Sequence, residues 1–86
     1  MTLDDIRQTC LMLPGCTEDV KWEKDLCFLV AGKMFCVTSL EGSPVSMSLK
    51  VPDEAFEEIS SRHGFKPAPY LARAHWVMAE DIQILS

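Results

Sequence analysis

The hydrophobic positions near the amino terminus recur with the period of an α-helix. Four of them follow one another at intervals of three or four residues: Leu3, Ile6, Cys10 and Leu13. Thr2 and Asp5 have the spacing of a capping box, with Asp in place of the usual Glu. The pattern predicts an amphipathic helix over residues 2–13, which Pro14 and Gly15 end. Its apolar side needs a sheet to lie on.

The centre of the chain has the shorter period of β-strands. Four strands are predicted in succession: one around Val20 and Trp22, then Leu26–Val30, Met34–Leu40 and Val45–Val51. The last of them alternates most strictly, because valine, methionine and leucine there take turns with Ser46, Ser48 and Lys50. This alternation is typical of an antiparallel sheet with one face buried and the other in contact with water.

An acidic helix and a final strand complete the pattern. Residues 53–60 follow Pro52 and carry acids in the first turn, where the helix dipole favours them. Gly64 ends this helix, and a proline-interrupted connection leads to a strand around Trp76–Met78. The order α-β-β-β-β-α-β indicates a single α+β domain over residues 1–86. It should be a two-layer sandwich, with two helices packed on one face of an antiparallel sheet of about five strands.

The composition is that of a globular protein with a packed core. Hydrophobic residues make up 48% of the chain and charged residues 24%, which is far from the profile of disorder. No apolar run approaches the roughly 20 residues that cross a bilayer. The acidic start "MTLDDIRQ" lacks the features of a signal peptide. We therefore expect a cytoplasmic protein that does not associate with membranes.

The four cysteines have no spacing that indicates a disulfide framework or a metal site. They are Cys10, Cys16, Cys27 and Cys36, and no two form a C-x-x-C pair. Without a sign of secretion we expect reduced thiols and no bound metal or other cofactor. Cys16 follows the turn at Pro14 and Gly15 and leaves two alternatives, an exposed reactive thiol or an ordinary one. The second is favoured.

No arrangement of residues in the sequence indicates catalysis. A nucleophile–base pair, a glycine-rich phosphate loop and a paired-carboxylate spacing are all absent, and His63 and His75 form no motif. We expect that the chain is not an enzyme.

Charge is distributed unevenly along the chain. The net charge of −5 argues against a protein that coats nucleic acid, because phosphate binding depends on clustered lysine and arginine. Residues 51–60 carry four acids and no base, whereas residues 61–79 carry three bases and no acid. If the acidic helices cover one face of the sheet, the opposite face is left basic and suits an anion. The alternative is that these lysines only protect strand edges from aggregation, and the charge pattern by itself favours that alternative.

Three segments together carry a resemblance to a known family. "LPGCTEDVKWEKDLCFLVAGKMFCV", "MSLKVPDEAFEEI" and "GFKPAPYLARAHWV" resemble, in order and spacing, the MmcQ/YjbR family of small bacterial proteins, from about Leu13 to Val77. The resemblance implies a CyaY-like fold, in agreement with the order of elements above. It also implies DNA binding by two strand-turn-strand wings.

Carried onto this chain, the family's binding surface would use basic and aromatic side chains of the strands and turns. The residues are Lys21, Trp22, Lys33 and Lys50, with Arg62, Lys66 and Arg73 extending the surface. Trp76 matches as well, although core packing is the favoured interpretation for it. The alternative function is a small non-catalytic domain that binds a protein partner or an anionic small ligand, with Trp22 and Tyr70 as anchors.

The chain departs from the family pattern after its last strand. Related chains continue into a C-terminal helical segment, whereas this one stops at Ser86. Either an apolar edge is exposed there, through which the protein would form a homodimer, or the binding surface has changed.

Overall fold

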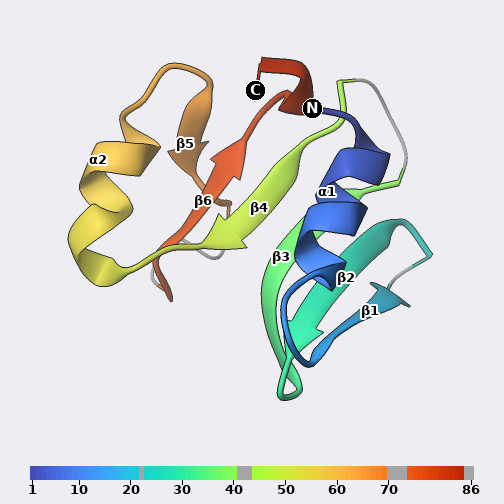
Figure 1. Cartoon of the computed structure of the whole chain (residues 1–86). Coiled ribbons are helices and arrows are strands. Elements are labelled where there is room, and N and C mark those ends of the chain that lie inside the picture. The colour runs from blue at the N-terminus through green and yellow to red at the C-terminus, as the bar shows by residue number, and fades with distance from the viewer. Residues whose placement is uncertain (22, 41–43, 70–73, 85–86) are drawn as a thin grey trace.

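The computed structural model describes residues 1–21, 23–40, 44–69 and 74–84 (Figure 1). Its first element, helix α1, spans Leu3–Leu11. The Thr2 hydroxyl accepts a hydrogen bond from the Asp5 N–H at 3.1 Å, and the Asp5 carboxylate accepts one from the Thr2 N–H at 2.9 Å. The predicted capping box is thus confirmed, and these bonds lower the pKa of Asp5. Ile6 and Cys10 are buried on the side that faces the sheet.

Six antiparallel strands form one sheet in the order β1-β2-β3-β4-β6-β5. Their bounds are β1 Cys16–Lys21, β2 Asp25–Val30, β3 Lys33–Ser39, β4 Met47–Lys50, β5 Phe65–Pro67 and β6 Trp76–Ala79. The predicted antiparallel sheet is confirmed, with one strand more than the sequence indicated. The additional strand, β5, lies at the edge of the sheet, where Pro67 interrupts no inner ladder.

The second predicted helix divides into two pieces. A 3-10 turn, η1, spans Asp53–Ala55, and helix α2 spans Phe56–Ser60. α2 contacts β5 and β6, whereas α1 lies across the other part of the sheet, so that β4 runs between the two helices (Figure 1). A last 3-10 turn, η3, spans Ile82–Ile84. The two helices and the sheet form the predicted α+β sandwich.

The core lies between α1 and the sheet. It is formed by six buried residues from α1, β2, β3 and η3: Ile6, Cys10, Leu26, Phe28, Cys36 and Ile82. Cys27 and Trp76 belong to the opposite face of the sheet, because neighbouring residues of a strand alternate between its two faces. Both are nevertheless buried, with exposed fractions of 0% and 5%. The prediction that the opposite face of the sheet is in contact with water is therefore wrong at these two positions, and burial of Trp76 confirms its interpretation as a core residue.

Candidate nucleic-acid-binding site

Lys33 stands at the tip of the hairpin that joins β2 to β3. Ala31 and Gly32 form the two-residue turn, with φ of 54° and 76°. Positive φ at both positions is what a type I′ turn requires, and this turn type matches the twist of paired strands. The turn thus places Lys33 at the first position of β3, with its side chain exposed.

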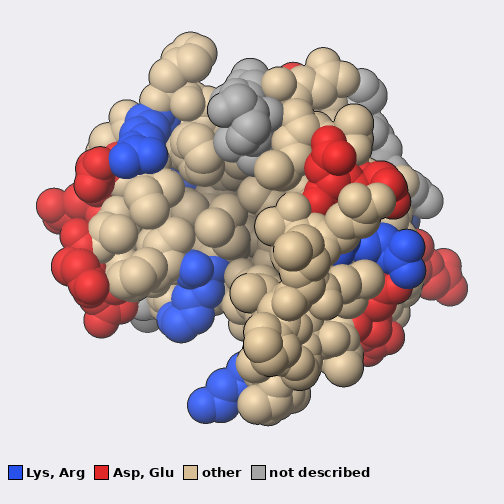
Figure 2. Space-filling view, in the orientation of Figure 1, with Lys and Arg blue, Asp and Glu red and all other residues tan. Residues whose placement is uncertain are grey.

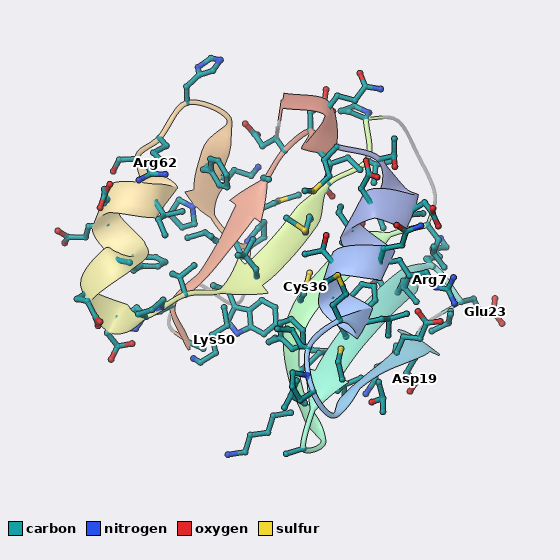
Figure 3. The ribbon with its side chains drawn as sticks, in the orientation of Figure 1. Arg7, Asp19, Glu23, Cys36, Lys50 and Arg62 are labelled. Carbon is teal, nitrogen blue, oxygen red and sulfur yellow. The ribbon has the colours of Figure 1, made fainter. Side chains whose placement is uncertain are left out.

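Lys50 ends strand β4 at the same end of the sheet. β3 and β4 are antiparallel, and Cys36 pairs with Leu49. Lys50 therefore lies beside the start of β3, near the position of Lys33. Its side chain projects from the end of β4 (Figure 3). The ammonium of Lys50 donates a hydrogen bond to the Ala74 carbonyl at 2.8 Å. Since that acceptor is neutral, the bond leaves the positive charge of Lys50 uncompensated.

Among the described residues, Lys33 and Lys50 differ from Arg62 and Lys66 in their lack of an ion-pair partner. Within residues 1–21, 23–40, 44–69 and 74–84, neither Lys33 nor Lys50 forms an ion pair. Figure 2 shows basic side chains at the lower end of the molecule and acidic ones gathered on its two flanks. The hairpin end, defined here as Lys33 and Lys50 with the Ala31–Gly32 turn, is thus a small positive surface on an acidic protein.

The other described basic residues of the predicted surface lie elsewhere. Lys21 is half-buried and pairs in register with Asp25, at the opposite end of β2 from the hairpin turn. Arg62 forms an ion pair with Glu58 at 2.6 Å, one turn away on α2. Lys66 lies on edge strand β5 and forms an ion pair with Glu80 at 3.4 Å. The structure therefore brings together two of the predicted residues, Lys33 and Lys50.

Three predicted positions fall outside the described residues. Trp22, Tyr70 and Arg73 belong to this group, and their proposed binding roles stay predictions.

His75 adds an ionisable group at the edge of the hairpin end that sequence reasoning missed. Its Nδ1 contacts the Asp53 carboxylate, and its ring lies 5.0 Å from the ring of Phe56, measured between centroids. Its backbone has φ of 59°, and its carbonyl accepts a hydrogen bond from the Val51 N–H at 3.1 Å. No local pattern in the sequence indicates this position, because its partners come from a distant segment.

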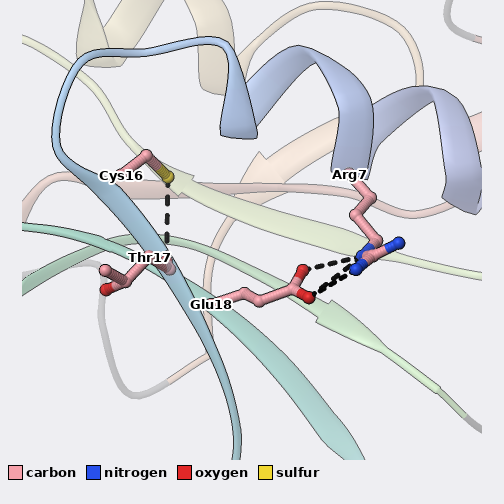
Figure 4. A network of polar contacts seen from close by, with 4 residues as sticks. All are labelled: Arg7, Cys16, Thr17 and Glu18. Atoms are coloured by element: carbon pink, nitrogen blue, oxygen red, sulfur yellow. Dashed lines mark hydrogen bonds and ion pairs between the residues drawn. The ribbon is translucent and has the colours of Figure 1, made fainter.

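The four cysteines are free thiols, and three of them are buried. Burial raises the pKa of the thiols of Cys10, Cys27 and Cys36. Cys16 is half-buried against the core, and its Sγ lies 3.7 Å from the Thr17 carbonyl (Figure 4). This environment favours the interpretation of Cys16 as an ordinary thiol.

A bidentate ion pair ties α1 to the edge strand. Arg7 donates to both carboxylate oxygens of Glu18, at 2.7 and 2.8 Å (Figure 4). The pair raises the pKa of Arg7 and lowers the pKa of Glu18. Arg7 is thereby neutralised and contributes little to a basic surface.

The described part of the chain contains neither a metal centre nor a membrane-spanning helix. No three His, Cys, Asp or Glu side chains there are grouped to hold a metal ion. No helix there has the length and apolar character needed to span a bilayer. A homodimer through the C-terminal edge stays a prediction; β6 pairs with strands on both of its sides, and Ile82 is buried.

Comparison with known families identifies the chain. The YjbR family model matches residues 11–85. The chain belongs to the YjbR family. The resemblance found in the sequence is therefore confirmed, and it extends beyond the three quoted segments. No curated protein matches this YjbR chain.

Two solved structures are similar to this YjbR chain. One is the Deinococcus radiodurans protein DR2400, with a DUF419 domain, which has 33% sequence identity to this chain and a TM-score of 0.78. The match covers 91% of this chain and 62% of DR2400. This chain thus spans less than two thirds of the length of that protein. A Pseudomonas syringae protein is 17% identical with a TM-score of 0.73, over 92% of this chain and 80% of that one. At that identity the likeness concerns the fold alone.

Proposed function

We propose that this YjbR chain is a DNA-binding module that contacts the phosphate backbone with the hairpin end. The observation that carries the proposal is the pair Lys33 and Lys50, which are exposed on neighbouring strands. Neither forms an ion pair within the described residues, in contrast to Arg7, Arg62 and Lys66. Two uncompensated ammonium groups at one end of a sheet attract a polyanion.

The spacing of the two lysines suits one DNA strand. Neighbouring strands lie about 4.8 Å apart, and Lys33 stands two residues beyond Phe35, which is level with Lys50, so their Cα atoms should be about 8 Å apart. Phosphates of one DNA strand advance by about 3.4 Å each along the helix axis. Because the backbone also winds around the axis, successive phosphates lie farther apart than this axial rise, and the two ammonium groups would suit neighbouring phosphates of one strand.

Two phosphate contacts predict weak binding with a shallow dependence on salt. The slope of log K against log salt is about −0.9 for each neutralised phosphate, which makes it about −2 here. The net charge of −5 opposes any wider contact with DNA. Contacts to phosphate carry no direct sequence information, so the pair should bind different duplexes alike.

Titration of a labelled duplex across a series of salt concentrations tests the proposal. The variant Lys33→Glu with Lys50→Glu should abolish binding. The matched control, Arg62→Glu with Lys66→Glu, changes the net charge equally but alters side chains that are already ion-paired. It should retain most of the affinity.

Two results would contradict the proposal. One is the absence of binding at low salt by a protein shown to be folded by circular dichroism. The other is an equal loss of affinity in both double variants, which would mean that overall charge, and not the hairpin end, governs binding.

A further inference from the structure

Two thiols meet between α1 and β3. Cys10 lies near the end of α1 and Cys36 lies within β3, and both are buried in the same core cluster. Cys36 projects from β3 toward α1 (Figure 3). Its S–H donates a hydrogen bond to the sulfur of Cys10. The two sulfurs are therefore neighbours, and a small approach of α1 to β3 would bring them to the length of a disulfide bond, about 2.05 Å.

A hollow connects this pair of thiols with the outside. It has a volume of about 220 Å³, and both Cys10 and Cys36 line it. Thr9 and Lys50, whose side chains are exposed, line the same hollow. The hollow thus gives a small molecule a route to both sulfurs, whereas the burial of the pair keeps a large one away.

The other two cysteines are placed differently. Cys27 is buried on the opposite face of the sheet, because it lies between Leu26 and Phe28 of the core cluster along β2. Cys16 is half-buried at the start of β1 and packs against the core cluster, with its Sγ directed at the Thr17 carbonyl. Cys16 is therefore the thiol that competes with Cys36 for Cys10.

We propose that Cys10 and Cys36 are a modification site, at which hydrogen peroxide forms a disulfide that ties α1 to β3. The Cys10 thiolate attacks one oxygen of the peroxide, the O–O bond breaks, and the departing hydroxide takes up a proton to become water. The sulfenic acid formed on Cys10 is then attacked by the Cys36 sulfur, which has lost its proton. The S–O bond breaks and a second water leaves, so two thiols give up two electrons and hydrogen peroxide becomes two waters.

The order of these steps follows from the hydrogen bond. As its donor, Cys36 stabilises a thiolate on Cys10 and holds its own proton until Cys10 has reacted. Burial raises the pKa of both thiols, so little thiolate is present at pH 7 and the reaction is slow there. Below the pKa, the rate should rise about tenfold for each unit of pH, as the thiolate fraction does.

Peptide mapping of a variant without the competing thiol tests the proposal. Cys16→Ser is treated with hydrogen peroxide in its folded state, free thiols are blocked with iodoacetamide, and the protein is digested with trypsin. Cys10 lies in tryptic peptide 8–21, Cys27 in 25–33 and Cys36 in 34–50. Mass spectrometry should show peptides 8–21 and 34–50 joined, and dithiothreitol should separate them.

Three comparisons make the result specific. Cys16→Ser with Cys27→Ala lacks a second buried thiol and should form the same link at the same rate. Cys16→Ser with Cys10→Ala should form none. In urea, where the chain is unfolded, Cys16→Ser should give all three pairings of its thiols. The oxidised folded protein should also unfold at a higher urea concentration than the reduced one, because the bond restricts the unfolded chain.

Three outcomes would overturn the inference. One is that the folded Cys16→Ser protein forms no link between peptides 8–21 and 34–50 even at pH 9, where thiolate is more abundant. Another is that it gives the same mixture of pairings folded as unfolded, since the fold would then not select the pair. The third is an oxidised protein that unfolds at a lower urea concentration than the reduced one, because the bond would then distort the packing of α1 on the sheet.

Discussion

The two halves of this YjbR domain are held together differently. α1, with β1 to β3, buries Ile6 and Cys10 in the core, whereas α2 has no buried residue and lies beside β5 and β6. Basic residues also differ in how they are paired, but this difference does not follow the division into halves. Lys33 forms no ion pair within the described residues, whereas Arg7 in the same half faces a carboxylate. Arg62 and Lys66, in the second half, each face one as well. A count of basic residues therefore does not show which part of the surface attracts anions.

The largest expected difference between the halves concerns the loss of one isoleucine from each helix. Ile6→Ala should lower the free energy of unfolding by about 2–5 kcal/mol, because it leaves a cavity in the core. Ile59→Ala on α2 removes the same atoms from a half-buried site and should cost about 1 kcal/mol. Urea denaturation of both variants measures the difference. Equal costs would show that the two helices are anchored alike.

Alkaline pH should lower the stability of the protein through Cys36, which lies in the core between α1 and the sheet. The pKa of Cys36 is raised by burial, so its thiol stays protonated in the folded protein after it has ionised in the unfolded chain. The stability that it contributes is complete below the unfolded pKa of about 8.5 and is lost as pH rises above that value. The loss should reach about 2 kcal/mol for one such thiol at pH 10.

Cys36→Ala separates this effect from other alkaline titrations. The variant should be less stable at pH 7, because it loses buried atoms, but its stability should fall less steeply between pH 8 and 10. Denaturant titrations of both proteins across this pH range provide the measurement. Parallel curves would mean that Cys36 does not cause the alkaline loss.

The smallest expected effect lies in the turn that presents Lys33. Ala31 has φ of 54°, a conformation that costs an L-residue about 1–2 kcal/mol and that asparagine tolerates better. Ala31→Asn should therefore raise the free energy of unfolding by about 0.5–1 kcal/mol.

Gly32→Ala should have the opposite effect on the same turn. The added Cβ would meet no atom within 4 Å, but the φ of 76° disfavours alanine and should make the variant less stable. Thermal unfolding checks both, and a stabilised Gly32→Ala would argue against the assigned turn.

Much of the fold could be predicted because its signals are local. The capping box at Thr2 and the strand that ends at Lys50 are each read within a few residues, and each is present in the structure. One strand of the second half, β5, was missed. β5 has three residues, one of them Pro67, so its existence depends on pairing with β6 and not on its own pattern.

The candidate site was predictable only as a list of residues. The sequence contains Lys33, Lys50 and Lys66 as three similar exposed bases, and nothing near them along the chain distinguishes one from another. The pairing of β5 with β6 brings Lys66 to Glu80 and neutralises it. The register of β3 and β4 brings Lys33 and Lys50 to one end of the sheet.

The sequence by itself determined the period of each element, the caps, the turns and the membership in the YjbR family, because these depend on neighbours a few residues apart. The tertiary structure decided which face of the sheet is buried at Cys27 and Trp76, and which bases keep an uncompensated charge. Ion pairing and burial act over a few ångströms between segments that are distant along the chain, and only the folded arrangement sets those distances.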